Sequence, residues 1–435
     1  MLILLGFGGT NRAIAEKFAP CIVLDDSFEQ ESKDSLGNSL LPSAHIHKVL
    51  ANNPESLIVT SPGIPPHNAM IQAVYCFMET HKQTLFLSEY DFFAFHSKMP
   101  PSVWISGTNG KTTTTQILTH LLQSRGAQSG GNIGTPLAKL DPKSPLWILE
   151  TSSFTLHYTQ IAKPILYLLL PITQDHISWH ESYANYISDK LKPILSLREK
   201  EVAILPKNLE SHEFVQQSRA NLIFYQDSKD LAEIFHLDLD SIRFKEPFLL
   251  DAALAMSACE ILFSTQDYAL LNAFKIGAHK IEEFYDKCGN LWVDDSKGTN
   301  LDATMEAIKC YQNSQILLIL GGDDKGADLT PLFEWIAQCK VEIFAIGSNT
   351  DKLCNLAKTS NTPCNACYTL EVAVKKIQEV FANKNPLDSK VQSSQTSQDS
   401  TNTIALLSPA AASLDQFSSY KERGEKFKAY VLRDS

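Results

Sequence analysis

A glycine-rich turn between an apolar strand and a helical stretch constrains the fold of this chain more than any other feature. The run Gly107-Thr108-Asn109-Gly110-Lys111-Thr112 follows the expected strand Val103–Ser106 and precedes an expected helix, Thr113–Gln123. Glycines let the backbone curl so that its N–H groups face a phosphate, while the lysine reaches the terminal phosphates and the threonine hydroxyl holds Mg²⁺. Ile105 stands where the full phosphate-loop motif has its first glycine, and a plain strand–helix turn is the alternative. The context favours a nucleotide-binding domain.

Alternating strand and helix patterns divide the 435 residues into three blocks, 1–87, 88–277 and 278–435. Further apolar strands are expected at Leu2–Leu5, Cys21–Leu24, Leu57–Thr60, Leu146–Leu149, Ile165–Leu170, Leu291–Val293, Ile316–Leu320, Glu342–Ile346 and Ile404–Leu407. Helical patterns lie between the strands, among them Asn11–Phe18 and Tyr183–Leu197. Strands that alternate with helices through short loops predict parallel sheets, so we expect an α/β fold.

The composition narrows the class of partner and the compartment. A net charge of −11 without a long Lys/Arg run makes nucleic acid and anionic membranes poor partners. No apolar run approaches the ~20 residues of a membrane span, and the first residues lack the basic region of a signal peptide. Nine unevenly spaced cysteines are typical of a reduced, cytoplasmic protein. Cys354, Cys364 and Cys367 form the one cluster, but a zinc site there lacks an obvious fourth ligand.

A polar segment at about 384–403 interrupts the third block. It consists largely of Ser, Gln, Thr and Asp. Such a stretch cannot bury apolar surface, so we expect a disordered insertion on the surface of the last domain.

Acidic and histidine side chains follow two strands of the second block. Glu150 ends the strand that begins at Leu146, and Asp175-His176 follows the strand Ile165–Leu170. Ligands bind at the carboxyl ends of the strands in open α/β sheets, and a nucleotide-bound Mg²⁺ needs oxygen ligands. Helix caps or satisfied polar strand ends are the alternative. Their place after one phosphate loop favours a catalytic site.

These motifs together resemble the central domain of the Mur ligase family, which also includes the folylpolyglutamate synthetases. The resemblance rests on Gly107–Thr112, Glu150-Thr151-Ser152-Ser153-Phe154 and Asp175-His176. It implies three domains: a Rossmann-like domain for a uridine diphosphate substrate, a central ATPase domain with a mostly parallel sheet, and a Rossmann-like domain for an amino acid. It also implies that ATP activates a carboxylate as an acyl phosphate, which an amine then attacks.

Three motifs of the third block resemble those of one group within this family. Asp294–Asn300, Gly321–Gly326 and Leu407–Phe417 are similar to those of the members that add D-glutamate to UDP-N-acetylmuramoyl-L-alanine, in cytoplasmic peptidoglycan precursor synthesis. His279-Lys280 stands where a His-Arg pair often opens the domain, and a lysine loses the planar fork of arginine. The resemblance implies a probable monomer that takes small-molecule substrates.

The resemblance also implies a role for individual residues. ATP would contact Gly107, Thr108, Asn109, Gly110, Lys111, Thr112, Thr113 and Asp295. Two Mg²⁺ ions would be held by Thr112, Glu150, His176 and a carbamylated Lys190, the last three acting in catalysis with Lys111. The uridine nucleotide would contact Thr10, Asp25, Ser61, Gly63, Asn132 and His176. D-Glutamate would contact Lys297, Thr299, Lys325, Ser413, Leu414 and Tyr420.

Alternatives remain open at this point. The partial glycine fingerprint Gly6–Asn11, taken alone, would suggest NAD, and its turn residues could be purely structural. A folylpolyglutamate synthetase or a ligase for a diamino acid would carry the same central domain. A regulator that binds nucleotides without catalysis is the alternative from another class, and the intact Lys111, Glu150, His176 and Lys190 speak against it.

Overall fold

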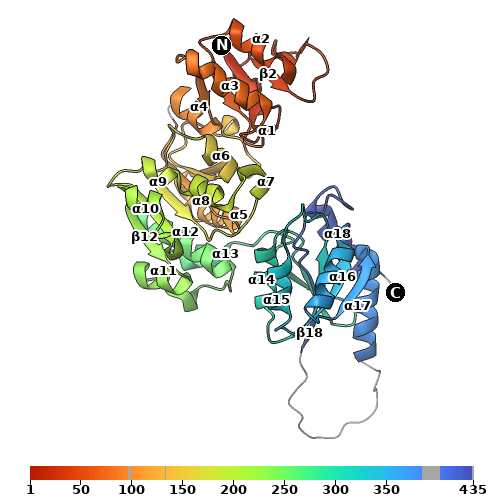
Figure 1. Cartoon of the computed structure of the whole chain (residues 1–435). Helices are drawn as coiled ribbons and strands as arrows, with labels where there is room; N and C mark the ends of the chain where they lie inside the picture. The colour runs from red at the N-terminus through yellow and green to blue at the C-terminus, as the bar shows by residue number, and fades with distance from the viewer. Residues whose placement is uncertain (97–98, 133, 385–401, 434–435) are drawn as a thin grey trace, which may run out of the picture. The chain divides into compact units, whose positions relative to one another are not determined.

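The structure is a computed structural model that describes residues 1–96, 99–132, 134–384 and 402–433 (Figure 1). The chain forms two compact units, Met1–Phe274 and Lys275–Ser435. Three six-stranded sheets alternate with helices, so the predicted α/β fold class is confirmed. The domain limits expected near residues 87 and 277 stay predictions. The insertion expected at about 384–403 falls mostly on residues 385–401, which lie outside the described residues, whereas Lys384 ends α17 and Thr403 begins β18.

The first sheet has the strand order β3-β4-β2-β1-β5-β6. Its strands are β1 (Leu2–Leu5), β2 (Ile22–Asp25), β3 (Ser32–Lys33), β4 (Ser39–Pro42), β5 (Leu57–Thr60) and β6 (Leu85–Leu87). All neighbours are parallel except β3 and β4. Helices α1 (Gly9–Lys17), α2 (Ile46–Asn52) and α3 (Ala69–Thr80) connect them. Ile3, Leu4 and Leu5 are all fully buried, because helices cover both faces of a parallel sheet.

The second sheet has the order β12-β11-β10-β7-β9-β8 and is parallel throughout. Its strands are β7 (Ser102–Ser106), β8 (Gln128–Gly131), β9 (Trp147–Glu150), β10 (Leu166–Leu169), β11 (Val202–Pro206) and β12 (Asn221–Tyr225). The helices of this region are α4 (Glu89–His96), α5 (Lys111–Leu122), α6 (Ser153–Tyr158), α7 (Ile177–His180), α8 (Tyr183–Leu191), α9 (Pro193–Ser196), α10 (Glu213–Gln217), α11 (Ser228–Phe235), α12 (Phe248–Phe263) and α13 (Tyr268–Ala273).

The single helix expected over Tyr183–Leu197 is wrong in one respect. The structure divides it into α8 and α9 at Lys192, whose own backbone keeps helical dihedral angles (φ −49°, ψ −39°). Pro193 has no N–H to donate to the preceding turn, so the hydrogen-bond ladder cannot continue through it.

The first two sheets pack together within one compact unit. The hydroxyl of Tyr158 donates to the carbonyl of Ile64 at 2.7 Å, and Trp179 joins the apolar core beneath the first sheet. Asp91 on α4 is fully buried and accepts backbone N–H groups of Gln160, Ile161 and Ala162, each at 2.8 Å. α4 therefore fastens the loop that follows α6.

The third sheet has the order β13-β14-β18-β15-β16-β17 and is parallel except between β13 and β14. Its strands are β13 (Glu282–Tyr285), β14 (Leu291–Asp294), β15 (Gln315–Gly321), β16 (Val341–Ile346), β17 (Cys364–Tyr368) and β18 (Thr403–Leu407), and its helices are α14 (Leu301–Lys309), α15 (Thr330–Ile336), α16 (Thr350–Thr359), α17 (Leu370–Lys384) and α18 (Tyr420–Leu432). Leu318 and Leu320 pack with α14, α15 and α16, whereas Leu317 and Ile319 pack with α17 and α18. This alternation is the period of two that a strand covered on both faces requires.

Among the described residues, no helix has the length and apolar character needed to cross a membrane.

We predict that Asp91→Ala destabilises the unit Met1–Phe274 by about 2–3 kcal/mol, because it leaves backbone N–H groups without their acceptor. The change would be measured as the free energy of unfolding in urea, followed by circular dichroism. Glu79→Ala, at an exposed position of α3, is the matched control and should change this free energy by less than about 0.5 kcal/mol. Equal effects of the two substitutions would contradict the role given to Asp91.

Candidate functional site

The carboxyl ends of three adjacent strands form the frame of the candidate site. β7 lies between β10 and β9, with Leu169 opposite Ser106 and Ile105 opposite Glu150. The segments that leave these strands therefore begin side by side at one edge of the sheet. They are the three segments in which the sequence placed the phosphate loop, the acidic motif and the Asp-His pair.

The phosphate loop is shaped by two glycines that other residues cannot replace. Gly107 and Gly110 have φ angles of 140° and 83°, a region that side chains rarely adopt. A Cβ at Gly107 would lie 2.5 Å from the Cβ of Leu170, and one at Gly110 would lie 2.4 Å from Oδ1 of Asp251. The loop is thus pressed against its neighbours. α5 begins at Lys111, directly after it, and directs its first N–H groups toward the loop.

Two lysines converge on the carbonyl of Gly107. Nζ of Lys111 donates to this oxygen at 3.0 Å and to the carbonyl of Thr108 at 2.6 Å. Nζ of Lys190, which comes from α8, donates to the Gly107 carbonyl at 2.7 Å and is almost fully buried. Burial, together with the charge of Lys111, holds the pKa of Lys190 well below its usual range. The structure therefore brings the two predicted lysines together at the loop.

Glu150 offers a buried oxygen without a partner. Only 2% of this residue is exposed. Its Oε1 accepts a hydrogen bond from Nδ2 of Asn132 at 2.7 Å, but Oε2 has no hydrogen-bond partner among the described residues. A buried carboxylate oxygen left in this way is strongly disfavoured unless a cation or donor reaches it. Glu150 and Asn132, which were predicted separately for metal and for the uridine nucleotide, are thus brought together.

His176 precedes α7 in a left-handed conformation, with a φ angle of 54°. Its Nε2 lies 3.5 Å from Oδ2 of Asp175, and its ring contacts the ring of Phe154 edge-on. Burial lowers the pKa of His176 against the opposing effect of Asp175, and the charges of Lys111 and Lys190 lower it further. A neutral imidazole results, which can act as a metal ligand.

His180 is a residue of this region that the sequence reasoning missed. Its Nδ1 lies 2.8 Å from Oδ2 of Asp189, and its Nε2 lies 2.9 Å from Oγ of Ser153. The only sequence signal was a second histidine four residues after His176, which by itself indicates nothing more than a shared helix face.

The candidates of the first sheet lie at the carboxyl ends of its central strands. Oδ2 of Asp25, at the end of β2, accepts the N–H of Phe7 at 2.6 Å. Ser61 follows β5, and a Cβ at Gly6 would lie 2.9 Å from the Cβ of Ser61. Since β1 lies between β2 and β5, these turns meet at one edge. The remaining two candidates, Thr10 and Gly63, belong to α1 and to the turn after β5.

In the second unit, Asp295 and Lys297 follow β14. Asp295 is buried and accepts the hydroxyl of Ser408 at 2.7 Å, and burial raises its pKa to about 7. The Nζ of Lys297 lies 5.8 Å from the ring centroid of Tyr420. Asp295, a predicted ATP contact, thus lies two residues before Lys297, and the fold brings Tyr420 at the start of α18 close to Lys297.

Three of the other candidates for amino-acid binding come from two adjacent loops. Asp323 forms a bridge with Ala412, which joins the loop after β15 to the loop after β18. The first loop carries the exposed Lys325. The second carries Ser413, which is 3% exposed, and Leu414, which is 65% exposed. Thr299 lies exposed after Lys297 in the loop that follows β14.

A buried arginine holds these loops in place. Nη2 of Arg423 donates to the carbonyls of Ser296 and Ala411, and Nε donates to Oγ of Ser296 at 3.0 Å. Burial lowers the pKa of Arg423 to about 10, so the guanidinium stays charged at neutral pH. Two predicted amino-acid contacts, Lys297 and Ser413, follow these partners closely in the chain. Arg423 therefore fixes the backbone that carries them.

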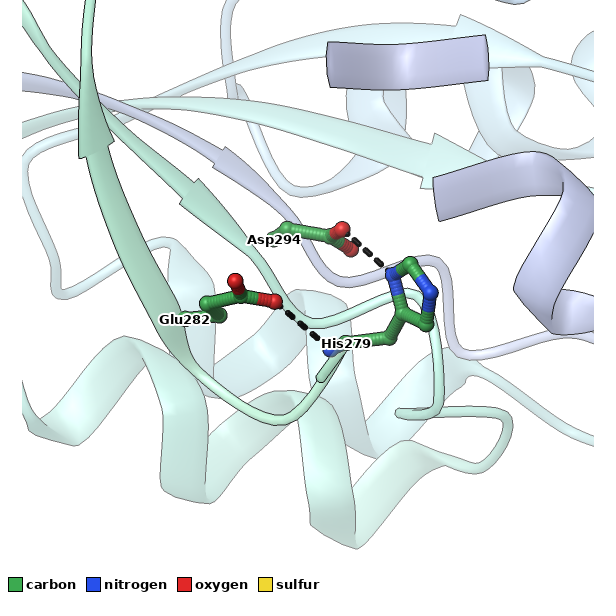
Figure 2. A group of neighbouring side chains, drawn as sticks. All are labelled: His279, Glu282 and Asp294. Carbon is green, nitrogen blue, oxygen red and sulfur yellow. Dashed lines mark hydrogen bonds and ion pairs between the residues drawn. The ribbon is translucent and has the colours of Figure 1, made fainter. Parts of the chain in front are cut away.

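Figure 2 shows a further cluster, in which the side chains of His279, Glu282 and Asp294 approach one another. Nδ1 of His279 lies 2.7 Å from Oδ2 of Asp294, and the N–H of His279 donates to Glu282. Their potential ligand atoms lie within 4.8 Å of one another. Nζ of Lys428, however, lies 2.6 Å from Glu282 and 3.9 Å from Asp294, so an ammonium already balances this charge.

The cysteine cluster does not form a metal centre within the described part of the chain. Sγ of Cys354 lies 3.6 Å from Sγ of Cys364, but Sγ of Cys367 turns to the carbonyl of Asn365. The His279 cluster is the only described group of three potential ligands, and it contains no cysteine.

Comparison with known proteins agrees with this arrangement. Residues 105–252 match the Mur ligase middle domain. A UDP-N-acetylmuramoylalanine--D-glutamate ligase of Campylobacter jejuni is 47% identical over 98% of both chains, and one of Helicobacter pylori is 46% identical over 99% of both chains. The crystal structure of MurF from Acinetobacter baumannii superposes with a TM-score of 0.60 at 14% identity, covering 99% of this chain and 90% of that one. Similarity that extends over nearly the whole chain means that this protein belongs to the Mur ligase family.

Proposed function

We propose that this protein uses ATP to join D-glutamate to UDP-N-acetylmuramoyl-L-alanine, in the cytoplasmic synthesis of peptidoglycan precursors. The observation that carries the proposal is the 47% identity, over 98% of both chains, to an enzyme named for this ligation. The geometry of the phosphate loop, Glu150 and Lys190 supports it. We assign the uridine nucleotide to residues 1–87, ATP to residues 88–277 and D-glutamate to residues 278–435.

In this proposal the phosphate loop and the start of α5 bind the phosphates of ATP. The contacts are Gly107, Thr108, Asn109, Gly110, Lys111, Thr112 and Thr113, with Asp295 of the second unit. Backbone N–H groups at a helix start and a lysine ammonium form a suitable anion site. Nζ of Lys111 would exchange its hydrogen bonds to the carbonyls of Gly107 and Thr108 for bonds to phosphate oxygens, which are stronger acceptors for an ammonium.

The residues fit the two Mg²⁺ ions that such a reaction requires. Glu150 provides an oxygen without a partner, Thr112 a hydroxyl and His176 a neutral imidazole. Lys190 would contribute after its amine takes up CO₂, which forms a carbamate and releases a proton. Burial lowers the pKa of Lys190 and so favours the neutral amine that this reaction needs. Bound Mg²⁺ would neutralise charge on the phosphate oxygens.

The chemistry follows from the charges that the site collects. A carboxylate oxygen of the acceptor attacks the γ-phosphorus of ATP, and ADP leaves, so that an acyl phosphate forms. The neutral amine of D-glutamate then attacks the acyl carbon, and the tetrahedral intermediate expels phosphate to leave the amide. Lys111 reduces the repulsion between the carboxylate and the triphosphate, which is mainly a task of positioning and charge neutralisation.

The substrate contacts keep the roles that the resemblance implied. Thr10, Asp25, Ser61, Gly63, Asn132 and His176 are assigned to the uridine nucleotide substrate. Lys297, Thr299, Lys325, Ser413, Leu414 and Tyr420 are assigned to D-glutamate. Lys297 and Lys325 offer two cations for the two carboxylates of an acidic amino acid. The ring of Tyr420 lies beside the ammonium of Lys297.

We predict that Lys111→Ala lowers kcat by roughly a hundredfold or more without unfolding the protein, because a preorganised charge at the reacting phosphate is lost. The release of phosphate with ATP, Mg²⁺, acceptor and D-glutamate measures the rate. Lys207→Ala, which removes an exposed lysine after β11, is the control and should keep the wild-type rate. A Lys111→Ala variant of wild-type activity would contradict the phosphate-binding role.

We predict that Lys190→Ala is weakly active and that formate or acetate partly restores its rate, by supplying the missing oxygen ligand. The rate would be followed as a function of the added acid. The same acids should leave Lys111→Ala inactive, since that variant lacks a cation. Carbon-13 NMR of the wild-type protein in labelled bicarbonate should show a carbamate signal. Absence of both the signal and the rescue would contradict carbamylation.

We predict that phosphate release with ATP, Mg²⁺ and UDP-N-acetylmuramoyl-L-alanine depends on D-glutamate. L-Glutamate should be poorer by roughly 10⁴-fold, because the wrong stereoisomer leaves hydrogen-bond donors of the site unpaired. Meso-diaminopimelate should be equally poor, because its additional ammonium meets Lys297 and Lys325. Release of phosphate with L-glutamate and a folate acceptor, and none with the muramoyl nucleotide, would refute the proposed function and indicate a folylpolyglutamate synthetase.

A further inference from the structure

His180 joins two helices through both nitrogens of its ring. Its side chain is fully buried. Nδ1 lies 2.8 Å from Oδ2 of Asp189 on α8, and Nε2 lies 2.9 Å from Oγ of Ser153 on α6. The hydroxyl of Ser153 can donate or accept, so both hydrogen bonds form without a charge on the ring. Nδ2 of Asn185 also donates to the carbonyl of His180 at 2.9 Å, which fixes the backbone.

The ring is also held by aromatic neighbours. Phe154 lies in a stacked arrangement with a centroid distance of 5.5 Å, and Tyr186 contacts the ring edge-on at 5.1 Å. The hydroxyl of Tyr186 lies 3.0 Å from Oγ1 of Thr108, in the phosphate loop. The position of His180 is therefore coupled to the loop as well as to the two helices.

His180 and its partners are close in the chain to three of the four residues to which we assigned metal binding, namely Glu150, His176 and Lys190. Ser153 follows Glu150 by three residues, Asp189 directly precedes Lys190, and His176 precedes His180 by four residues. Ser153 lies just after β9, Asp189 and Lys190 lie within α8, and His176 lies in the turn after β10. The three segments therefore come from different elements of the fold. Within the described part of the chain, His180 belongs to the segment of His176 and bonds to both of the others, and His157 on α6 also bonds directly to Asp189, at 3.0 Å.

We propose that His180 is a positioning residue that holds the segments of Glu150, His176 and Lys190 in the arrangement needed to bind Mg²⁺ and to stabilise the carbamate of Lys190. The proposal rests on the function assigned above. His180 touches no substrate in it and acts through Ser153 and Asp189. Partners that orient metal ligands in this way typically change metal affinity by roughly 10- to 100-fold when they are removed.

A histidine that merely fills the core would have other consequences. Its loss would lower the stability of the unit and would change metal binding and carbamylation only in proportion to unfolding. The substitution His180→Phe keeps an aromatic ring for Phe154 and Tyr186 and removes both hydrogen bonds. Ser153→Ala keeps the bond of His180 to Asp189 and cuts only the connection to the segment of Glu150.

The experiment compares these two variants with the wild type by two measurements that do not depend on turnover. The first is the carbamate signal in carbon-13 NMR with labelled bicarbonate. The second is the binding of Mn²⁺ in the presence of ADP, measured as loss of the free Mn²⁺ signal in electron paramagnetic resonance. Thr84→Val is the matched control, because it removes a buried hydroxyl bond of 2.7 Å to the carbonyl of Pro54 at the edge of the first sheet.

We expect His180→Phe to weaken Mn²⁺ binding by at least roughly tenfold and to reduce the carbamate signal strongly, with a smaller loss of both in Ser153→Ala. The double variant should lose little beyond His180→Phe, because the two residues share one bond. Thr84→Val should lower the unfolding midpoint but keep both signals. Should His180→Phe fail to fold, Ser153→Ala still tests the bridge.

Two results would overturn the proposal, and they differ in meaning. If the wild type showed neither the carbamate nor Mn²⁺ binding, the metal site assigned under the proposed function would itself be wrong. If the wild type showed both and the folded variants kept them within about twofold, the metal site would stand and the positioning role of His180 would be wrong.

Discussion

The parallel pairing of β10, β7 and β9 is the constraint on which the proposed catalytic site depends. Each strand is an apolar run, and Ile105, Leu149 and Leu169 are fully buried. Burial on both faces favours one register, because a slip by one residue would turn every side chain to the opposite face and disrupt its packing. Once the register is fixed, the segments after Ser106 and Glu150 must begin side by side. Apolar packing in the sheet thereby determines where its polar groups meet.

Within that frame, the phosphate loop carries an electrostatic cost in the absence of a ligand. Lys111 and Lys190 both donate to one carbonyl, that of Gly107. Two ammonium groups this close repel each other in a buried setting, which favours either loss of a proton or arrival of an anion. Phosphate at the loop satisfies the first lysine, and a carbamate reverses the charge of the second. The site is therefore arranged for the charges of its substrates.

The sequence predicted what is encoded locally and missed what depends on distant partners. The phosphate loop and the strands around it could be predicted because glycines and apolar runs act over a few residues. The close approach of Gly110 to Asp251 and the bond of His180 to Ser153 could not, since each joins residues from separate elements of the chain. The polar edge strand β17 lacked an apolar run, and Pro193 divided a helix whose polar-apolar pattern continued through it.

The two compact units use buried charge in different ways, and this difference bears on the proposed division of labour. The guanidinium of Arg423 in the second unit donates hydrogen bonds to carbonyls and to the hydroxyl of Ser296. It therefore stabilises the loops that carry Lys297 and Ser413. Glu150 in the first unit keeps an oxygen without a partner among the described residues. A saturated charge stabilises one backbone geometry, as stereospecific recognition of an amino acid demands. A buried carboxylate oxygen that lacks a hydrogen-bond partner carries a desolvation penalty, and a cation that binds there would relieve it.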